Sequence, residues 1–305
     1  MRIAYKTKNG IYYHGAVEKA LKSKSLEKFH QKINLIFTSP PFPLNRKKKY
    51  GNLQGDDYIE WLSSLSSLFA NYLTKDGSIV IEMGNAWVPG KPVMSTLAIK
   101  SLLAFLEEGN FHLCQQFVWH NKAKLPSPAQ WVNITRSRVK DAFTHIWWMS
   151  KTLNPKADNR CVLQDYSPRM KTLLKTKKYN AGKRPSQHVI GETSFLTDNS
   201  GSIPSNVIVS SNTHSNTDYQ NFCRNKNIVP HPARMPIDIP EFFIKLLTKP
   251  GDTVLDPFGG SNATGEAAEK LGRKWIAIEQ NEEYIEGSKG RFLCKSVASS
   301  RKTMK

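Results

Sequence analysis

The chain has 305 residues, of which 39% are hydrophobic and 23% are charged, and its formal net charge is +19. This length fits one large α/β domain, or such a domain with a smaller insertion. No stretch approaches the roughly 18 consecutive apolar residues of a membrane helix, and the first residues lack the apolar core of a secretory signal, so we expect no membrane partner and a cytoplasmic location. The four cysteines form no Cys-x-x-Cys pair and the eight histidines show no ligand spacing, so we expect no disulfide framework and no metal.

Short apolar strands alternate with helical stretches towards both ends of the chain. The expected strands are Ile11–Tyr13, Ile33–Phe37, Ser78–Glu82, Gln116–Trp119, Thr144–Met149, Thr253–Leu255 and Trp275–Ile278. The expected helices are Asp56–Leu73, Val93–Glu108, Pro240–Leu247, Ala263–Leu271 and Asn281–Phe292. This alternation predicts βαβ units and a largely parallel sheet.

The middle of the chain has a different composition. From residue 151 to about residue 227 it is rich in Lys, Asn, Ser and Thr and shows little periodicity, so we expect an inserted, loop-rich recognition region. Residues 122–186 hold 15 Lys and Arg against 3 Asp. Such clustering is typical of a surface that binds a polyanion, although a merely solvated basic surface is the alternative.

A glycine-rich loop follows one of the last expected strands. The strand Thr253–Leu255 ends in Asp256, the residues Phe258-Gly259-Gly260-Ser261-Asn262 form a tight loop, and an Ala-rich helix follows. Glycines let a ligand approach the backbone closely, and the start of the helix offers free N–H groups. Glu279, at the end of the next strand, is placed to bind both hydroxyls of a ribose.

Two details favour S-adenosylmethionine over a dinucleotide or ATP at this loop. Asp256 repels phosphate but suits a cationic ligand, and no Gly-Lys-Ser/Thr phosphate cradle follows the glycines. A ribose combined with an ammonium and a sulfonium therefore fits best. The structural alternatives are a turn cap at Asp256 and a solvated strand end at Glu279.

A second motif, Thr38-Ser39-Pro40-Pro41-Phe42, ends an earlier strand. Prolines fix their own φ and donate no backbone hydrogen bond, so the carbonyls here are held rigidly. Alone, the motif also fits a strand-ending turn. Beside the glycine loop it resembles the β class of DNA amino-methyltransferases, and Ser-Pro-Pro-Phe resembles their N4-cytosine branch. The resemblance to the PvuII-type N4-cytosine-specific enzymes covers about residues 11–292 and is carried by TSPPF, KLPSPAQWVN, RPSQHVIGETSF, NSGSIPSN, HPARMPIDIPEFFI and DPFGGSNATG.

The resemblance implies an α/β fold of the S-adenosylmethionine-dependent methyltransferase (Rossmann-like) type. Its sheet is mixed, mostly parallel, seven-stranded and circularly permuted, with an inserted target-recognition region. The catalytic half of the methyltransferase domain is expected at residues 1–150, the target-recognition region at 151–227 and the cofactor-binding half at 228–305.

The implied reaction moves a methyl group from S-adenosylmethionine to the N4 amine of a flipped-out cytosine in double-stranded DNA. The methylated site is thereby protected from a cognate restriction endonuclease, a functional rather than physical partner, in a prokaryotic cytoplasm. The chain is expected to be a monomer or a homodimer.

The same resemblance assigns roles to individual residues. The Ser39 side chain and the Pro40 carbonyl accept the two amine hydrogens, Phe42 stacks on the base, and Glu82 relays a proton or orients Ser39, so that catalysis is mostly positioning. The expected catalytic residues are Ser39, Pro40, Pro41, Phe42 and Glu82. The expected cofactor-binding residues are Thr38, His231, Asp256, Phe258, Gly259, Gly260, Ser261, Asn262 and Glu279. The expected DNA-binding residues, which mostly contact phosphate, are Arg46, Lys47, Lys48, Lys122, Lys124, Arg136, Arg138, Lys183 and Arg184.

One position departs from the family pattern. Members usually place an acid just after a glycine, against the adenine amine, but here Gly15 is followed by Ala16. Either another contact holds the adenine or cofactor affinity is reduced. The alternative functions are an N6-adenine DNA methyltransferase, which shares the amine chemistry, a methyltransferase for an amine of protein or RNA, and a non-catalytic DNA-binding protein with this fold.

Overall fold

The computed structural model describes residues 1–42, 53, 55–213 and 216–293. Three of the expected DNA-binding residues, Arg46, Lys47 and Lys48, lie outside the described part of the chain. The chain divides into two compact units. The larger unit comprises Met1–Ala157 and Asn206–Lys305, and the smaller unit is Asp158–Ser205, which is narrower than the recognition region expected at residues 151–227.

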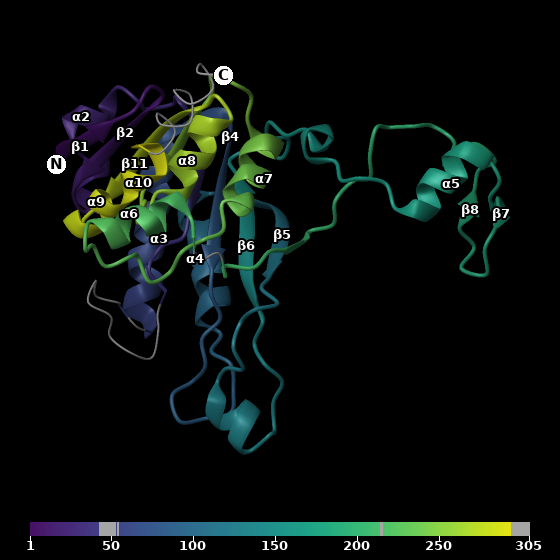
Figure 1. Ribbon diagram of the computed structural model, residues 1–305, viewed down its shortest axis with the longest axis horizontal. Coiled ribbons are helices and arrows are strands. Elements are labelled where there is room, and N and C mark those ends of the chain that lie inside the picture. The colour runs from purple at the N-terminus through teal and green to yellow at the C-terminus, as the bar shows by residue number, and fades with distance from the viewer. Residues whose placement is uncertain (43–52, 54, 214–215, 294–305) are drawn as a thin grey trace, which may run out of the picture. The chain divides into compact units, whose positions relative to one another are not determined.

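A mixed sheet forms the centre of the larger unit (Figure 1). Its strands are β1 (Arg2–Lys6), β2 (Gly10–His14), β3 (Ile33–Thr38), β4 (Leu73–Met83), β5 (His112–His120), β6 (Phe143–Ser150), β9 (Val207–Val209), β10 (Thr253–Asp256) and β11 (Lys274–Glu279). Their spatial order is β1-β2-β11-β10-β3-β4-β6-β5-β9. The central run from β2 to β4 is parallel, β1 and β6 are antiparallel to their neighbours, and β9 is parallel to β5.

The mixed, mostly parallel sheet expected from the sequence is confirmed, with every expected strand in place. Among the described residues the sheet has nine strands rather than seven, because β1 and β9 add to its two edges. Edge strands bury few side chains, and β9 is only three residues long, so neither leaves a strong apolar pattern in the sequence.

Helices cover both faces of this sheet. In the larger unit they are α1 (Val17–Leu21), α2 (Lys24–Glu27), α3 (Gly55–Tyr72), α4 (Leu97–Gly109), α6 (Asp218–Asn225), α7 (Asp238–Leu247), α8 (Ala263–Lys270), α9 (Glu282–Ser288), α10 (Gly290–Leu293) and the π-helical turn η1 (Gln130–Ile134). Ile36 of β3 joins the core beneath α3 and α4, whereas Phe37 packs on Phe243 of α7, with ring centroids 5.7 Å apart. The central strands are therefore continuously apolar, as expected of parallel strands covered on both faces.

Two expected helices differ in extent from the observed ones. The helix expected from Val93 begins only at Leu97, because Trp87 and Met94 pair as a bridge and the Ser95 hydroxyl accepts a hydrogen bond from the Leu97 N–H. The helix expected at Asn281–Phe292 is divided at Lys289 into α9 and α10. These local bonds compete with helix formation and are invisible to a periodicity argument.

The smaller unit contains the short helix η2 (Asn159–Val162), α5 (Pro168–Thr176) and a hairpin of β7 (Gly182–Lys183) and β8 (Val189–Ile190). All of its residues are described, and none of its hydrophobic side chains is fully buried. It is held by contacts such as the edge-to-face pair Tyr179–Phe195 and the bridge Gln164–Ser202. A unit without a core of its own exposes most of its surface.

The topology brings the sequence motifs to one edge of the sheet. The strands β2, β11, β10, β3 and β4 are parallel neighbours, so their carboxyl ends lie side by side. Gly15 follows β2, Glu279 ends β11, Asp256 ends β10, Ser39 follows β3 and Glu82 lies near the end of β4. Ligands of open α/β sheets bind at this carboxyl edge.

Candidate active site

A cavity of about 670 Å³ lies at the carboxyl edge in the larger unit. A volume of this size is ordinary for a small-molecule or cofactor site. The expected site residues in its wall are Ser39, Pro40, Pro41, Phe42, Glu82, Lys124, His231, Asp256, Phe258, Gly259, Gly260, Ser261 and Glu279. The cavity thus joins residues 38–42, which we call the amine-site motif after its expected role, to residues 257–262, which we call the glycine loop.

At one end of the cavity, the Ser39 hydroxyl donates a hydrogen bond of 2.6 Å to Glu82 Oε2. Glu82 is 3% exposed, and this burial raises the pKa of its carboxyl group to about 7, against weaker opposing effects of the Ser39 bond and the Lys124 charge. A hydroxyl that donates to a carboxylate keeps its lone pairs for a second partner. Near neutral pH this pair can therefore present Ser39 Oγ to the cavity as a hydrogen-bond acceptor.

The remainder of the motif forms the wall beside this pair. Pro40, Pro41 and Phe42 all line the cavity. Gly84, just beyond β4, makes room for the ring, since a Cβ at that position would lie 3.0 Å from Phe42. Trp119 and Phe143 contribute two further aromatic side chains to the wall of the same cavity.

Asp256 lines the cavity, but its carboxylate is already bonded within the protein. Oδ1 accepts hydrogen bonds from Thr38 Oγ1 (2.8 Å) and the Phe258 N–H (3.1 Å), and Oδ2 accepts one from Thr264 Oγ1 (2.6 Å). Burial raises the pKa of this group, while the three hydrogen bonds lower it. This geometry is that of the turn cap given above as the structural alternative, and it ties the glycine loop to β3.

Two residues expected to bind the cofactor do not line the cavity. Thr38 is buried and spends its hydroxyl on Asp256. Asn262 adopts a left-handed conformation with φ 60° and caps α8, its Oδ1 accepting from the Gly265 N–H. Both residues therefore support the glycine loop without contributing to the cavity wall.

The glycines permit close packing around the loop. A Cβ on Gly259 would lie 2.7 Å from Tyr12 Oη, and Gly260 has φ +48° with the His231 ring against it. The buried Tyr12 hydroxyl donates to the Gly260 carbonyl at 2.8 Å. No larger side chain fits at Gly259 without displacing these neighbours, so the backbone itself forms this part of the wall.

Glu279 lies at the tip of β11 and is fixed by backbone amides. Oε2 accepts from the Gly260 N–H at 3.0 Å, and Oε1 accepts from the N–H groups of Gln280 and Asn281, both at 2.9 Å. Burial raises the pKa of this carboxyl group, and the amides oppose that rise. A carboxylate has about four acceptor positions, so Glu279 keeps capacity for ribose hydroxyls.

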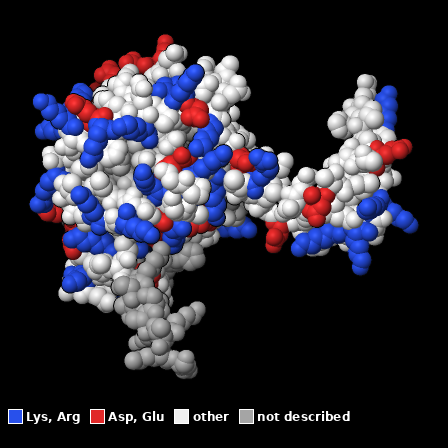
Figure 2. All heavy atoms as spheres, turned by 90° about the horizontal axis from the view of Figure 1, so that it is seen from above, with Lys and Arg blue, Asp and Glu red and all other residues white. Residues whose placement is uncertain are grey.

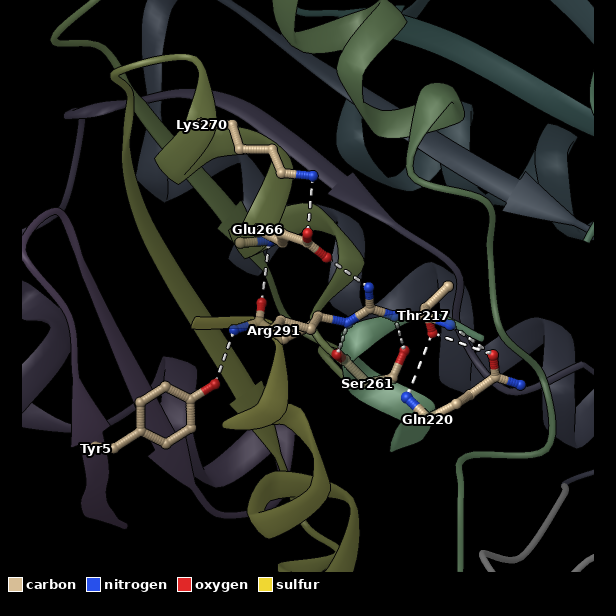
Figure 3. Close-up of polar contacts among 9 residues, drawn as sticks. Tyr5, Thr217, Gln220, Ser261, Glu266, Lys270 and Arg291 are labelled. Atoms are coloured by element: carbon tan, nitrogen blue, oxygen red, sulfur yellow. Dashed lines mark hydrogen bonds and ion pairs between the residues drawn. The ribbon is translucent and has the colours of Figure 1, made fainter. Parts of the chain in front are cut away.

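Arg291 of α10 supports the glycine loop from outside the cavity (Figure 3). Its guanidinium donates to the Ser261 carbonyl, to Ser261 Oγ at 3.0 Å and to Glu266 Oε2 at 2.6 Å. Glu266 also pairs with Lys270 at 2.8 Å, and although burial opposes the shift, these two cations hold its pKa below the usual value. This contact could not be expected from the sequence, because Arg291 and Ser261 are 30 residues apart and share no motif.

The expected DNA-binding residues of the larger unit lie on the connection between β5 and β6, which we call the β5–β6 lobe (residues 121–142). Arg138 donates to the carbonyls of Pro92 and Ser137. Lys140, which follows on the same connection, donates to the carbonyls of Lys122 and Lys124, and these bonds help to close the lobe. Lys122 and Arg136 are exposed, and neither side chain bonds to another described residue. Figure 2 shows Lys and Arg spread over the visible face of the larger unit with fewer Asp and Glu between them.

The two expected DNA-binding residues of the smaller unit lie on its hairpin. Lys183 is exposed on β7. The Arg184 side chain donates to the Asn180 carbonyl at 2.6 Å, which ties the start of the turn to the residues that precede β7.

Sequence reasoning missed several residues in the cavity wall. They include Glu18 on α1, Trp61 on α3, Asn121 in the β5–β6 lobe, Asn212, and Tyr284 on α9. Each comes from a segment that carries no motif, and only the fold brings it to the carboxyl edge. The segment from His231 to Met235 also lines the cavity, and there His231 had been expected from the sequence to bind the cofactor.

The polar groups in the cavity wall fit S-adenosylmethionine. The carboxylates of Glu18, Glu82, Asp256 and Glu279 line it, and the left-handed Gly260 leaves a cradle that a Cβ would narrow. The same wall holds two cations, Lys124 and Arg234, so the four carboxylates outnumber them and favour hydroxyl, amine and sulfonium groups over phosphates. Among the described residues no cluster of ligands suits a metal ion, and no described helix is long and apolar enough to cross a membrane.

A sheet of this topology, with a glycine loop after β10 and an acid at the tip of β11, has the fold of the S-adenosylmethionine-dependent methyltransferases. The comparisons with known proteins narrow this class. A family model described as DNA methylase (N6_N4_Mtase) matches residues 33–290. The chain belongs to this family.

Individual relatives agree with that assignment. The chain is 45% identical over 302 residues to "Type II methyltransferase M.PvuII" of Proteus hauseri, covering 98% of this chain and 88% of the relative. The solved structure "PVUII DNA METHYLTRANSFERASE (CYTOSINE-N4-SPECIFIC)" matches with a TM-score of 0.76 and 39% identity, over 95% of this chain and 89% of that one. A complex of M1.HpyAVI with SAM shares the fold, with a TM-score of 0.54 and 21% identity over 92% of this chain and 98% of that one.

Proposed function

We propose that this chain is a DNA (cytosine-N4-)-methyltransferase of a prokaryotic restriction–modification system, with S-adenosylmethionine as the methyl donor. The cytosine-N4 specificity of the similar PvuII DNA methyltransferase, whose structure is 39% identical in sequence, supports the choice of cytosine N4. The single observation that supports the proposal most strongly is the Ser39–Glu82 hydrogen bond, because it leaves Ser39 Oγ able to accept a hydrogen bond in a cavity that the glycine loop also lines. The setting is cytoplasmic, the chain acts as a monomer or homodimer, and a cognate endonuclease is its functional partner.

The proposed roles follow from the geometry at Ser39. When Glu82 is ionised it takes the hydroxyl hydrogen, so Ser39 Oγ and the Pro40 carbonyl can each accept one hydrogen of a cytosine amine. Gripping both hydrogens draws the nitrogen out of conjugation with the ring and leaves its lone pair free. The bound cofactor supplies an electrophilic methyl group, and Glu82, through Ser39, takes the proton that the methylated amine must lose.

Target binding requires the cytosine to leave the duplex, at a cost of a few kcal/mol. The aromatic wall of Phe42, Trp119 and Phe143 offers a stacking surface for the extruded base. Lys122 and Arg136 of the β5–β6 lobe and Lys183 of the smaller unit are proposed to contact phosphate. The smaller unit, which has no buried core of its own, is proposed as the target-recognition region.

Methyl-labelled S-adenosylmethionine and genomic DNA lacking this modification test the proposal directly. After incubation the DNA is digested to nucleosides and the label is separated by chromatography. Label in N4-methylcytosine is expected. Label in N6-methyladenine instead would replace the cytosine assignment, and cofactor binding without any labelled nucleoside would favour a non-catalytic protein or another amine substrate.

A further inference from the structure

The parts of the cavity follow one another along the carboxyl edge of the sheet in the order of the strands. The amine-site end lies at β3 and β4, the glycine loop follows β10, and Glu279 ends β11. The next strand in the sheet beyond β11 is β2, with Glu279 paired to His14. A nucleoside whose reactive group points towards Ser39 and whose ribose meets Glu279 therefore carries its base towards the loop after β2.

That end of the cavity is lined by Gly15, Val17 and Glu18. Val17 and Glu18 open helix α1, and the side chain before them, Ala16, is a methyl group. Glu18 is thus the acid that this chain places at the β2 end of the cavity.

The Glu18 carboxylate is held in a fixed orientation on one side only. The indole N–H of Trp61 donates to Oε1 at 2.7 Å. The indole is itself packed between Tyr58 and Phe258, with ring centroids 5.5 Å and 5.6 Å away. Within the described part of the chain, Oε2 accepts no hydrogen bond and Glu18 forms no ion pair. Glu18 is half-buried in the cavity wall, so Oε2 is accessible from the cavity and can accept a hydrogen bond from a ligand there.

We propose that Glu18 Oε2 accepts a hydrogen bond from the 6-amino group of the adenine ring and thereby selects the base of the cofactor. The assignment rests on the proposed function, because it concerns the cofactor of that reaction. Trp61 positions the carboxylate, and Phe258, which packs on Trp61, belongs to the glycine loop. The contact also explains how a chain with alanine at position 16 recognises adenine.

The chemistry predicts a specific discrimination. An ionised carboxylate only accepts hydrogen bonds, so it pairs with the amino group of adenine and repels the carbonyl oxygen at the same position of hypoxanthine. A site built around an unpaired polar group rejects the analogue that lacks the matching group. The unmodified protein should therefore bind the adenine form far more tightly than the hypoxanthine form.

Calorimetric titration with S-adenosylhomocysteine and S-inosylhomocysteine tests this without any turnover. We expect the unmodified protein to prefer the adenosyl ligand by about 100-fold or more, given the loss of one charge-assisted bond and the added repulsion. Glu18→Ala should weaken the adenosyl ligand by about tenfold and bring the two affinities within about threefold of each other. Equal loss of affinity for both ligands, or an unchanged preference, would overturn the assignment.

Two further variants keep the test decisive. In Glu18→Gln the amide oxygen can still accept from Trp61 while the amino group faces the ligand, so the preference should shift towards the inosyl ligand. Retention of the full adenosyl preference would refute the proposal even if Glu18→Ala were unstable. Glu60→Gln removes the same charge from an exposed site on α3, outside the cavity wall, and should change neither affinity.

The failure of this inference is distinguishable from failure of the proposed function. If the unmodified protein binds S-adenosylhomocysteine but does not discriminate against the inosyl ligand, Glu18 has been misassigned and the methyltransferase proposal stands. If it binds neither ligand, the cofactor site itself is wrong and both proposals fall.

Discussion

If Glu82 acts on Ser39 as proposed, we expect the rate of methyl transfer to depend on pH, because burial raises the pKa of Glu82 to about 7. Protonation at Oε2 would reverse the polarity of the 2.6 Å bond to Ser39, because the acid would then donate to Oγ. The serine hydrogen would turn towards the amine, where an acceptor is needed. With a pKa of about 7, the ionised fraction, and with it the rate, should fall about tenfold for each pH unit below 7 and level off above it.

A single-turnover experiment isolates this step. Enzyme saturated with cofactor is mixed with limiting DNA duplex between pH 5 and pH 9, and the rate of N4-methylcytosine formation is measured. Glu82→Gln can still accept the Ser39 hydrogen through its amide oxygen, but it cannot take a proton. We expect its rate to be lower by about 100-fold at pH 8 and to be flat with pH.

The same substitution should affect stability in the opposite direction. Between the ordinary value of 4.5 and about 7, the folded protein keeps a proton on Glu82 that the unfolded chain has lost, so this group lowers stability as pH rises through that range. The full shift corresponds to an upper bound of about 3 kcal/mol. Glu82→Gln should therefore unfold at a higher temperature than the unmodified protein at pH 8, and by a smaller margin at pH 5.

The reasoning fails if Glu82→Gln keeps the sigmoidal pH profile of the unmodified enzyme, or if the latter shows no fall in rate down to pH 5. Glu107→Gln is the matched control, since that residue is exposed at the end of α4 and lies outside the cavity. It should change neither the rate nor its pH dependence.

Four other outcomes are expected. Ser39→Ala should lower the single-turnover rate by about 100-fold while calorimetry shows unchanged affinity for S-adenosylhomocysteine; equal loss of both would mean that Ser39 holds the cofactor. Arg291→Ala leaves Glu266 with Lys270 as its remaining cation and removes the support of Ser261. Urea unfolding should therefore show a loss of about 3 kcal/mol of stability, and calorimetry should show a lower affinity for S-adenosylhomocysteine. A loss of stability with unchanged affinity would mean that Arg291 serves folding alone. Gly259→Ala places a Cβ 2.7 Å from Tyr12 Oη, so it should lower the stability by about 1–3 kcal/mol and also lower the affinity for the cofactor. A variant as stable as the unmodified protein would contradict the close packing at this position. DNA affinity in electrophoretic shift assays should fall by orders of magnitude between 50 mM and 200 mM salt, and a flat profile would refute the phosphate contacts.

Much of the fold could be predicted from the sequence, because each central strand leaves an apolar run in its own segment of the chain. The central strands are buried on both faces, so apolar runs such as the one ending at Phe37 appear directly, and the motifs stand where those runs stop. A parallel sheet then dictates that the ends of β3, β10 and β11 meet at one edge. The positions of Ser39, Asp256 and Glu279 in one cavity follow from that rule.

The parts that could not be predicted depend on partners distant in sequence. Asp256 lines the cavity, as expected for a residue that faces a ligand, but its oxygens also accept hydrogen bonds from the hydroxyls of Thr38 and Thr264, and Thr38 is 218 residues away. Glu18 lies in a short helix with no motif, and its significance depends on Trp61, which is 43 residues away. Periodicity and spacing report neither kind of contact.

The bond between Thr38 and Asp256 also bears on how the two halves of the site work together. Thr38 directly precedes Ser39, and Asp256 directly precedes the glycine loop, so one buried 2.8 Å hydrogen bond joins the strand that ends at the proposed amine acceptor to the strand that ends at the proposed cofactor loop. Transfer of a methyl group needs the nitrogen, the methyl carbon and the sulfur in line, and small errors in that geometry slow the reaction strongly. The bond adds to the backbone pairing of β3 with β10 in holding these two segments at a fixed separation. Asp256, like Glu279, accepts three hydrogen bonds from the protein and keeps about one acceptor position for a ligand.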